Sequence, residues 1–185
     1  ELSDDTRVEM EASDNKVKIN TDFGTYNLMG KDPEEFPAAP DTNDGVEIGM
    51  GSMLLNKIIS TVSFAVSKDD LKPALTGVFF KIDSDLITAV STDGHRLAQY
   101  LCKNETKANF TGEVVIPKKF LNTIGSYTAG KEEIYLLIND NVFTAKMGID
   151  TVYTRIIDEK FPDYESVIPK DNDKEIKVDR KALLA

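Results

Sequence analysis

The chain has 185 residues, a length that suits one or two domains. With 41% hydrophobic and 29% charged residues, it is close in composition to an ordinary soluble globular protein. Its net charge of −10 argues, taken as a sum, against a tight nucleic-acid binder, because such proteins usually present a basic surface.

The N-terminal residues contain no apolar signal core, and no apolar run in the chain approaches the roughly 20 residues needed to span a bilayer. Cys102 is the only cysteine, so an intrachain disulfide is impossible. These features predict a cytoplasmic protein that makes no membrane contact.

Residues 50–66 are predicted to form the first helix. Their apolar side chains recur at spacings of three and four, which makes one apolar stripe along a helix. Phe64 falls on the opposite face, and the helical pattern does not explain it. Strands rich in apolar and β-branched residues are predicted next, at residues 75–82, 86–92, 96–102 and 112–116.

Pro117 suits the first turn of a second helix, which Gly125 should weaken and Gly130 should end. Three further strands are predicted at residues 133–138, 142–147 and 152–157. The order helix, strands, helix, strands predicts an α+β fold with antiparallel sheets, and not the alternation of a βαβ enzyme.

Two stretches of the chain resemble each other. Both contain a Phe-Pro pair, Phe36-Pro37 and Phe161-Pro162, and the pairs lie 125 residues apart. Each pair is followed by an acidic linker, a short strand-like segment (residues 46–48 and 176–178) and an apolar run. A fixed period indicates a repeated structural unit, and the alternative is chance similarity. The repeat predicts that residues 1–44 end one unit, that 45–172 form a complete unit and that 173–185 begin another.

The two predicted helices carry no acidic residue. Residues 50–67 contain Lys57, and residues 116–131 contain Lys118, Lys119 and Lys131. One mildly basic face on an otherwise acidic chain would make weak, salt-sensitive contact with phosphates without reading base sequence. The alternative is that these lysines are simply solvated.

The run from Ser91 to Ala98 holds the only histidine, His95, and Asp93 could orient its ring for acid–base chemistry. No serine sits in a nucleophile elbow, and one His with one Cys rarely suffices for a metal. The residue chemistry therefore favours a turn at Asp93-Gly94 that leads into the next strand.

The segment Thr92-Asp93-Gly94-His95-Arg96-Leu97-Ala98 resembles the most characteristic run of the bacterial DNA polymerase III beta subunit, the sliding clamp, in its middle domain. Four other segments resemble the same family in the same order: Leu75-Thr76-Gly77-Val78, Val115-Ile116-Pro117-Lys118-Lys119, Phe161-Pro162-Asp163-Tyr164 and Val167-Ile168-Pro169-Lys170. The family has three similar domains per subunit, which would account for the repeat.

The resemblance implies the DNA-clamp fold, with two helices per domain on an inner face and antiparallel sheets outside. Residues 1–44 would be the C-terminal part of domain 1, residues 45–172 the complete middle domain, and residues 173–185 the start of domain 3. In this family two subunits pair head to tail into a ring around duplex DNA, without catalysis and without a cofactor or metal. The DNA polymerase III alpha subunit, the clamp loader and other partners dock short peptides between the middle and last domains.

By resemblance, the middle-domain part of this peptide pocket maps onto Leu75, Thr92, Gly94, His95, Arg96, Leu97, Pro162 and Val167. Lys57, Lys118 and Lys119 match basic positions that face the DNA. Lys72 and Ser166 stand where many family members carry arginine, so the peptide selectivity is expected to differ. Two alternatives are a clamp-like module that binds peptides but not DNA, and an enzyme that uses His95 with Asp93.

Overall fold

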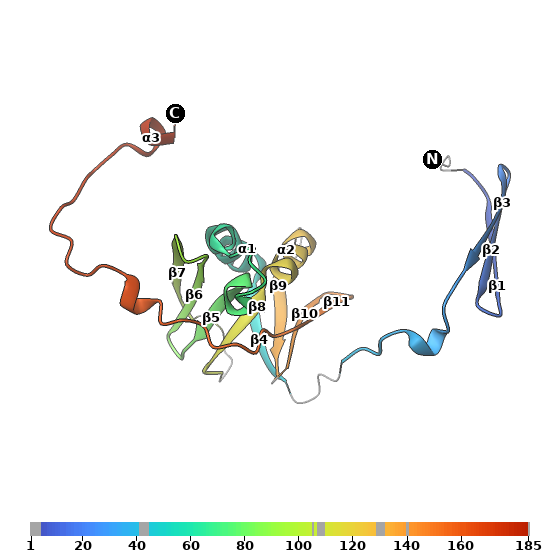
Figure 1. The fold of residues 1–185 in the computed structure, drawn as a ribbon, viewed down its shortest axis with the longest axis horizontal. Coiled ribbons are helices and arrows are strands. Elements are labelled where there is room, and N and C mark those ends of the chain that lie inside the picture. Colours follow the sequence, from blue (N-terminus) through green and yellow to red (C-terminus); the bar gives the residue numbers. More distant parts are fainter. Residues whose placement is uncertain are drawn as a thin grey trace. The chain divides into compact units, whose positions relative to one another are not determined.

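The computed structural model describes residues 5–40, 45–104, 106, 110–128, 132–139 and 141–184. The chain divides into two compact units, Glu1–Pro40 and Asp41–Ala185, each with its own sheet structure (Figure 1). Within the described ranges, no helix is long and apolar enough to cross a membrane.

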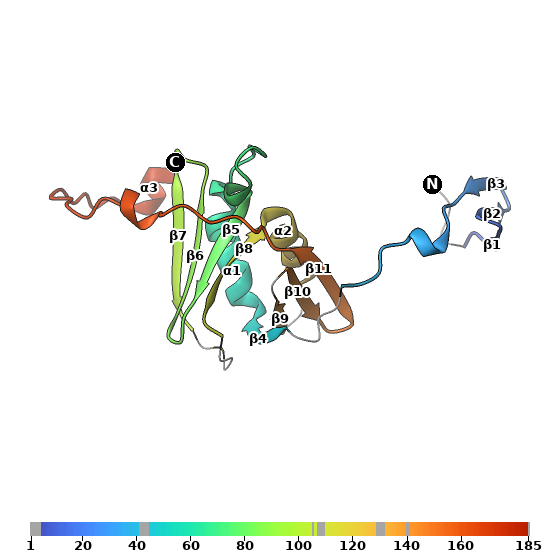
Figure 2. The ribbon, with the colours of Figure 1, turned by 60° about the horizontal axis from the view of Figure 1, so that its bottom comes forward.

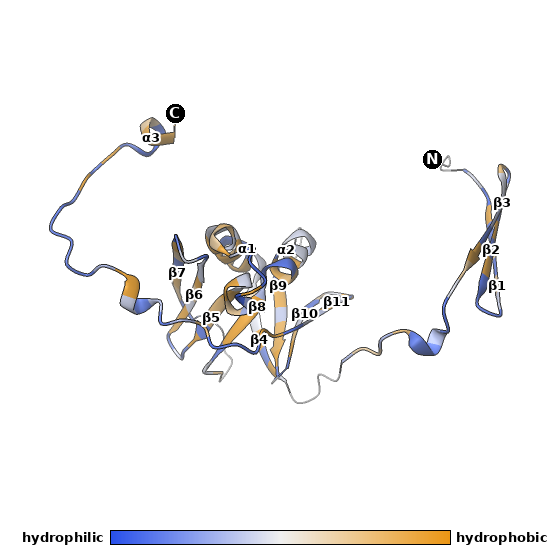
Figure 3. Cartoon of the chain, in the orientation of Figure 1, coloured by the Kyte–Doolittle hydropathy of each residue, from blue (hydrophilic) through white to orange (hydrophobic). Residues whose placement is uncertain are grey.

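The first unit is a three-stranded antiparallel sheet of β1 (Val8–Ser13), β2 (Lys16–Thr21) and β3 (Gly24–Met29), in that order. The register places Met10, Ile19 and Tyr26 in one row, and the next row on the same face holds Ala12, Val17 and Leu28. The opposite face is more polar. Figure 3 shows both hydrophobic and hydrophilic stretches on these strands. The apolar face is largely uncovered, since Met10 is 71% and Leu28 is 54% exposed.

Two four-stranded antiparallel sheets form the second unit. One has the order β11-β10-β9-β4 and the other the order β7-β6-β5-β8. The strands of the first are β4 (Val46–Gly51), β9 (Glu133–Ile138), β10 (Val142–Met147) and β11 (Asp150–Arg155). Those of the second are β5 (Gly77–Ile82), β6 (Leu86–Thr92), β7 (Leu97–Lys103) and β8 (Gly112–Pro117). The predicted α+β class with antiparallel sheets is confirmed.

Two helices, α1 (Ser52–Val62) and α2 (Lys118–Tyr127), lie on the same side of these sheets (Figure 1). They contact each other, and the Asn56 side chain donates a hydrogen bond to the Thr128 hydroxyl. A Cβ at Gly125 would meet Asn56 Oδ1 at 3.5 Å, an ordinary van der Waals contact, so the approach of the two helices does not require glycine there. The helix continues past Gly125 to Tyr127, although the sequence indicated a weak point. Gly130, the predicted end of this helix, lies outside the described residues.

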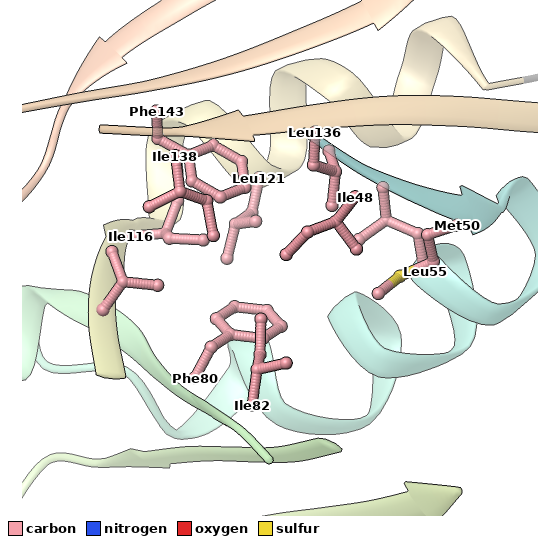
Figure 4. Close-up of a pocket in the computed structure, with 11 residues that line it drawn as sticks. Ile48, Met50, Leu55, Phe80, Ile82, Ile116, Leu121, Leu136, Ile138 and Phe143 are labelled. Atoms are coloured by element: carbon pink, nitrogen blue, oxygen red, sulfur yellow. The ribbon is translucent and has the colours of Figure 1, made fainter. Parts of the chain in front are cut away.

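The main core lies between the helices and the inner faces of both sheets. Leu55, Ile58 and Val62 of α1 and Leu121 and Ile124 of α2 are almost fully buried in it. Where the two sheets meet, a small cavity remains, with Ile48 and Leu136 on one side and Phe80 and Ile116 on the other (Figure 4). All of its lining residues are apolar, so it has no partner for a water molecule.

Some element boundaries differ from those predicted. Met50 lies in β4, which ends at Gly51, and does not begin the helix; Leu75 lies in the 3₁₀ turn η3 (Pro73–Thr76) ahead of β5. Pro117 caps α2 and is not its first residue. β11 begins at Asp150, two residues earlier than expected.

The strand-like segment predicted at residues 176–178 is not a strand. Ile176 and Val178 are 84% and 61% exposed, because the described chain places no partner strand beside them. The short helix α3 (Arg180–Leu184) follows.

Candidate functional site

After β11 the chain crosses the sheet β7-β6-β5-β8 on the face that the helices leave open (Figure 2). We call residues 156–168 the strap. The Ile157 amide donates to the Val115 carbonyl of β8 at 3.0 Å, which anchors the start of the strap. Phe161 stacks on Phe79 of β5 with 4.9 Å between ring centroids, and Tyr164 approaches the same ring at 5.9 Å.

The strap and the sheet together bury a second apolar cluster, made of Phe79, Val90, Val115, Phe161 and Tyr164. Burial is the main cause that raises the pKa of the Tyr164 hydroxyl above its ordinary value. We call the five side chains of this apolar cluster the aromatic floor, after the three aromatic rings that it contains.

Two of the predicted pocket residues, Leu75 and Leu97, are half-buried and pack against the aromatic floor from different elements. Pro162 and Val167 lie on the strap and are exposed, Val167 by 68%, while its neighbour Ile168 packs on the floor. The structure thus brings Leu75 and Leu97 together on one support, whereas Pro162 and Val167 do not pack on it.

The remaining predicted residues form the turn between β6 and β7. Thr92 and Leu97 are paired across the two strands, and Gly94 adopts a φ of 90°, which few residues other than glycine accept. The Thr92 hydroxyl donates to the Arg96 carbonyl at 2.8 Å and accepts from the Gly94 amide at 3.1 Å. Local hydrogen bonds therefore fix the turn and leave His95 and Arg96 exposed.

Asp93 organises this turn in a way that the sequence did not indicate. Its Oδ1 accepts the backbone amides of His95 and Arg96, both at 3.0 Å, and its Oδ2 accepts Arg96 Nε at 3.0 Å. These bonds, the His95 amide first, hold the pKa of Asp93 below its ordinary value. The carboxylate is thus committed to the backbone and to Arg96, and this arrangement gives no support to an acid–base pair with the His95 ring.

Phe64, unexplained by the helical pattern, has a contact in the structure. It lies in the 3₁₀ turn η2 (Ser63–Ala65) after α1 and is 57% exposed. The Arg96 guanidinium carbon lies over its ring, 5.6 Å from the centroid. This distance is within the range of a cation–π interaction.

The predicted DNA-facing lysines lie on the two helices. Lys57 is on α1, and Lys118 and Lys119 begin α2. Lys57 and Lys119 are exposed and Lys118 is half-buried. Neither helix contains an acidic residue, so the basic residues are not compensated within them. Lys131, which belonged to the same sequence argument, lies outside the described residues.

Among the described residues, no group of three or more His, Cys, Asp or Glu side chains is placed to hold a metal ion.

Comparison with protein families identifies the second unit. Residues 50–163, more than half of the chain, match the model of the DNA polymerase III beta subunit, central domain. The chain belongs to the DNA polymerase III beta subunit family. The match covers the turn from Thr92 to Leu97 and part of the strap, and it ends before Val167.

Curated relatives extend the likeness to both sides of the central domain. The chain is 31% identical over 182 residues to the beta sliding clamp of Halalkalibacterium halodurans, covering 96% of this chain and 48% of that one. It is 30% identical over 167 residues to the beta sliding clamp of Bacillus subtilis, covering 90% and 44%. The chain therefore spans about half the length of the beta sliding clamps that it matches.

Solved structures agree with the fold. The Bacillus subtilis DNA polymerase sliding clamp matches with a TM-score of 0.78 and 29% identity, over 89% of this chain and 44% of that one. The beta subunit from Pseudomonas aeruginosa matches with a TM-score of 0.81 and 22% identity, over 93% and 48%. A sliding clamp from the same organism that matches with a TM-score of 0.79 is bound to griselimycin.

Proposed function

We propose that this chain is part of a sliding clamp subunit, a non-catalytic processivity factor that encircles duplex DNA and tethers DNA polymerase III and other replication proteins. In this proposal residues 1–44 complete a first domain, residues 45–172 form the middle domain and residues 173–185 begin a third. Two subunits would close a ring. The observation that carries the proposal is the family match over residues 50–163, which includes the β6–β7 turn.

The arrangement around the aromatic floor suits a peptide-docking role. Leu75 and Leu97 offer a supported apolar surface, Val167 adds an exposed apolar side chain, and the β6–β7 turn supplies polar groups at the edge. Short peptides bind through a few apolar anchors with polar groups that fix their direction. The griselimycin complex of a related clamp supports a ligand-binding role for this family.

Docking is tested on the full-length subunit with a polymerase-type peptide. We expect His95→Ala or Leu97→Ala to weaken the affinity by about 1–2 kcal/mol, the usual size for an interface anchor. Ile149→Ala is the matched control, because Ile149 is fully exposed and lies in the turn between β10 and β11, which belong to the other sheet. Unchanged affinity in both pocket variants, measured by calorimetry, would contradict the pocket assignment.

DNA binding is tested in the assembled ring. Replacing Lys57, Lys118 and Lys119 by Gln should flatten the salt dependence of DNA association, by roughly 0.9 in the logarithmic slope for each phosphate that is no longer neutralised. The control replaces three exposed lysines away from the helices, Lys103, Lys160 and Lys170, and so changes the net charge equally. Equal slopes in both triple variants would count against the helix face.

The net charge of −10 favours one other candidate, a clamp-like module that binds peptides and never DNA. The salt titration separates the two functions, since the module would have no salt-dependent affinity for duplex DNA while its peptide affinity stayed intact.

A further inference from the structure

Arg96 is the one side chain of the β6–β7 turn that two other side chains hold at once. Its Nε donates to Asp93 Oδ2 at 3.0 Å, and its guanidinium carbon lies over the Phe64 ring. The Arg96 side chain nevertheless stays 58% exposed. An exposed arginine normally samples many rotamers and loses that freedom when a ligand binds. In this structure Asp93 and Phe64 already restrict the rotamers of Arg96 without a ligand, so less conformational entropy is left to lose on binding.

Asp93 can serve as a fixed support because it is itself anchored. Two backbone amides, those of His95 and Arg96, hold its Oδ1, and its side chain is only 21% exposed. Phe64 comes from another part of the chain, just after α1, so the guanidinium is held between the turn and the end of the helix.

We propose that Phe64 and Asp93 are positioning residues that hold the Arg96 guanidinium as an oriented donor at the rim of the docking site. This inference rests on the proposed peptide-docking function. The Nε is occupied by Asp93, so the terminal amino groups are the donors left to face a ligand. Because the Asp93 carboxylate lies beside the positive charge and compensates it, Arg96 favours a neutral oxygen, such as a peptide carbonyl or side-chain amide, over a carboxylate.

The positioning is tested first without any peptide, in the 185-residue chain. The Arg96 Nε–H resonance should be shifted and slow to exchange, because the Asp93 carboxylate accepts that proton. Phe64→Leu keeps an apolar side chain but removes the ring, and should move the resonance and speed its exchange. Phe64→Tyr keeps the ring and should preserve both properties. A resonance that is unaffected by Phe64→Leu overturns the role of Phe64.

The consequence for binding is measured with griselimycin as the probe and the full-length subunit as the protein. Phe64→Leu should weaken binding by about two- to five-fold, the factor that an exposed cation–π contact supports. Phe64→Tyr should restore it. Tyr127→Leu is the control, since it removes a 49% exposed ring from α2, outside the turn. Wild-type binding with no loss in Phe64→Leu overturns the inference, whereas no wild-type binding counts against the proposed docking function.

The ligand preference is tested with two peptides that differ by one glutamine-to-glutamate change at the position nearest Arg96. The wild type should bind the glutamine form at least as well as the glutamate form. Asp93→Asn should shift this ratio several-fold toward the glutamate form, because the compensating charge is gone. The ratio cancels any general loosening of the turn. A wild type that prefers glutamate overturns the neutral-oxygen preference.

Discussion

The strands β1–β3 and β9–β11 are similar in plan but lie in different surroundings. Each set is an antiparallel meander that leads to a Phe-Pro pair. In the second unit helices and a second sheet cover the inner face, and Phe161 is 7% exposed on the aromatic floor. In the first unit Phe36 is 83% exposed and the apolar face is open. The comparison indicates that alternation and turns specify the strands, whereas the elements packed against them decide what is buried.

The largest expected effect on stability is at a buried position of the second unit, compared with an exposed position of the first. Leu121→Ala removes a fully buried side chain beside the apolar cavity and should lower the free energy of unfolding of the second unit by about 3–5 kcal/mol. Leu28→Ala, in the 54% exposed position of the first sheet, should cost under about 1 kcal/mol.

Because the chain has no tryptophan, urea unfolding of these two variants is best followed by methyl NMR, which reads each unit separately. Similar losses in both would mean that the first sheet is covered in solution.

The phenylalanines of the two Phe-Pro pairs test the same contrast between a buried and an exposed side chain, with Phe161 on the strap and Phe36 in the first unit. Phe161→Ala removes the ring stacked on Phe79 and should destabilise the second unit by about 3 kcal/mol. Phe36→Ala should change stability by less than about 0.5 kcal/mol, the usual range for an exposed site. Thermal unfolding of both variants checks the difference, and a large effect of Phe36→Ala would reveal a partner for that ring.

Gly77 lies where β5, β8 and the strap approach one another closely. A Cβ there would lie 2.7 Å from the Ile116 carbonyl oxygen and 2.9 Å from Ile157 Cδ1. Gly77→Ala should therefore cost about 2 kcal/mol by forcing β5, β8 and the strap apart. In Gly49→Ala the nearest atom, 3.0 Å away, is Glu133 Oε1 at the end of a flexible side chain, so this control should cost much less. Equal unfolding midpoints would contradict the close approach.

The smallest expected effect concerns Asp93. Its pKa is lowered in the folded chain, so its stabilising contribution is present above the ordinary carboxyl range and is lost as the pH falls through the lowered value. We expect the pH dependence of stability in that acidic window to be weaker in Asp93→Asn. Carboxyl NMR titration of the wild type gives the pKa directly, and an unshifted value would contradict the observed hydrogen bonds.

Much of the fold could be predicted from the sequence. The bounds of β6, β9 and β10 agree with the predicted strands, because apolar runs bounded by turn residues are local signals. The failures occur where a distant partner decides. Residues 176–178 have strand composition but no strand beside them in the described chain, and Leu75 is held in the turn before β5.

Less of the candidate site than of the fold could be predicted from the sequence. The pocket residues came from the family resemblance, and their assignment stays a prediction. Three supporting features depend on tertiary contacts: the stacking of Phe161 on Phe79, the commitment of Asp93 to backbone amides and the place of Phe64 under Arg96. The sequence indicated these features only in part, through the repeated Phe-Pro pair, the turn composition at Asp93-Gly94 and a Phe64 side chain that the helical pattern did not explain.

The apolar cavity between the two sheets has a consequence for how the second unit responds to hydrostatic pressure (Figure 4). Water cannot occupy an apolar void of this kind, so the empty volume exists only while the sheets stay joined. Unfolding eliminates it and makes the volume change of unfolding more negative. The cavity between the sheets should therefore add to the pressure sensitivity of this unit, and filling it with a larger apolar side chain should reduce that sensitivity.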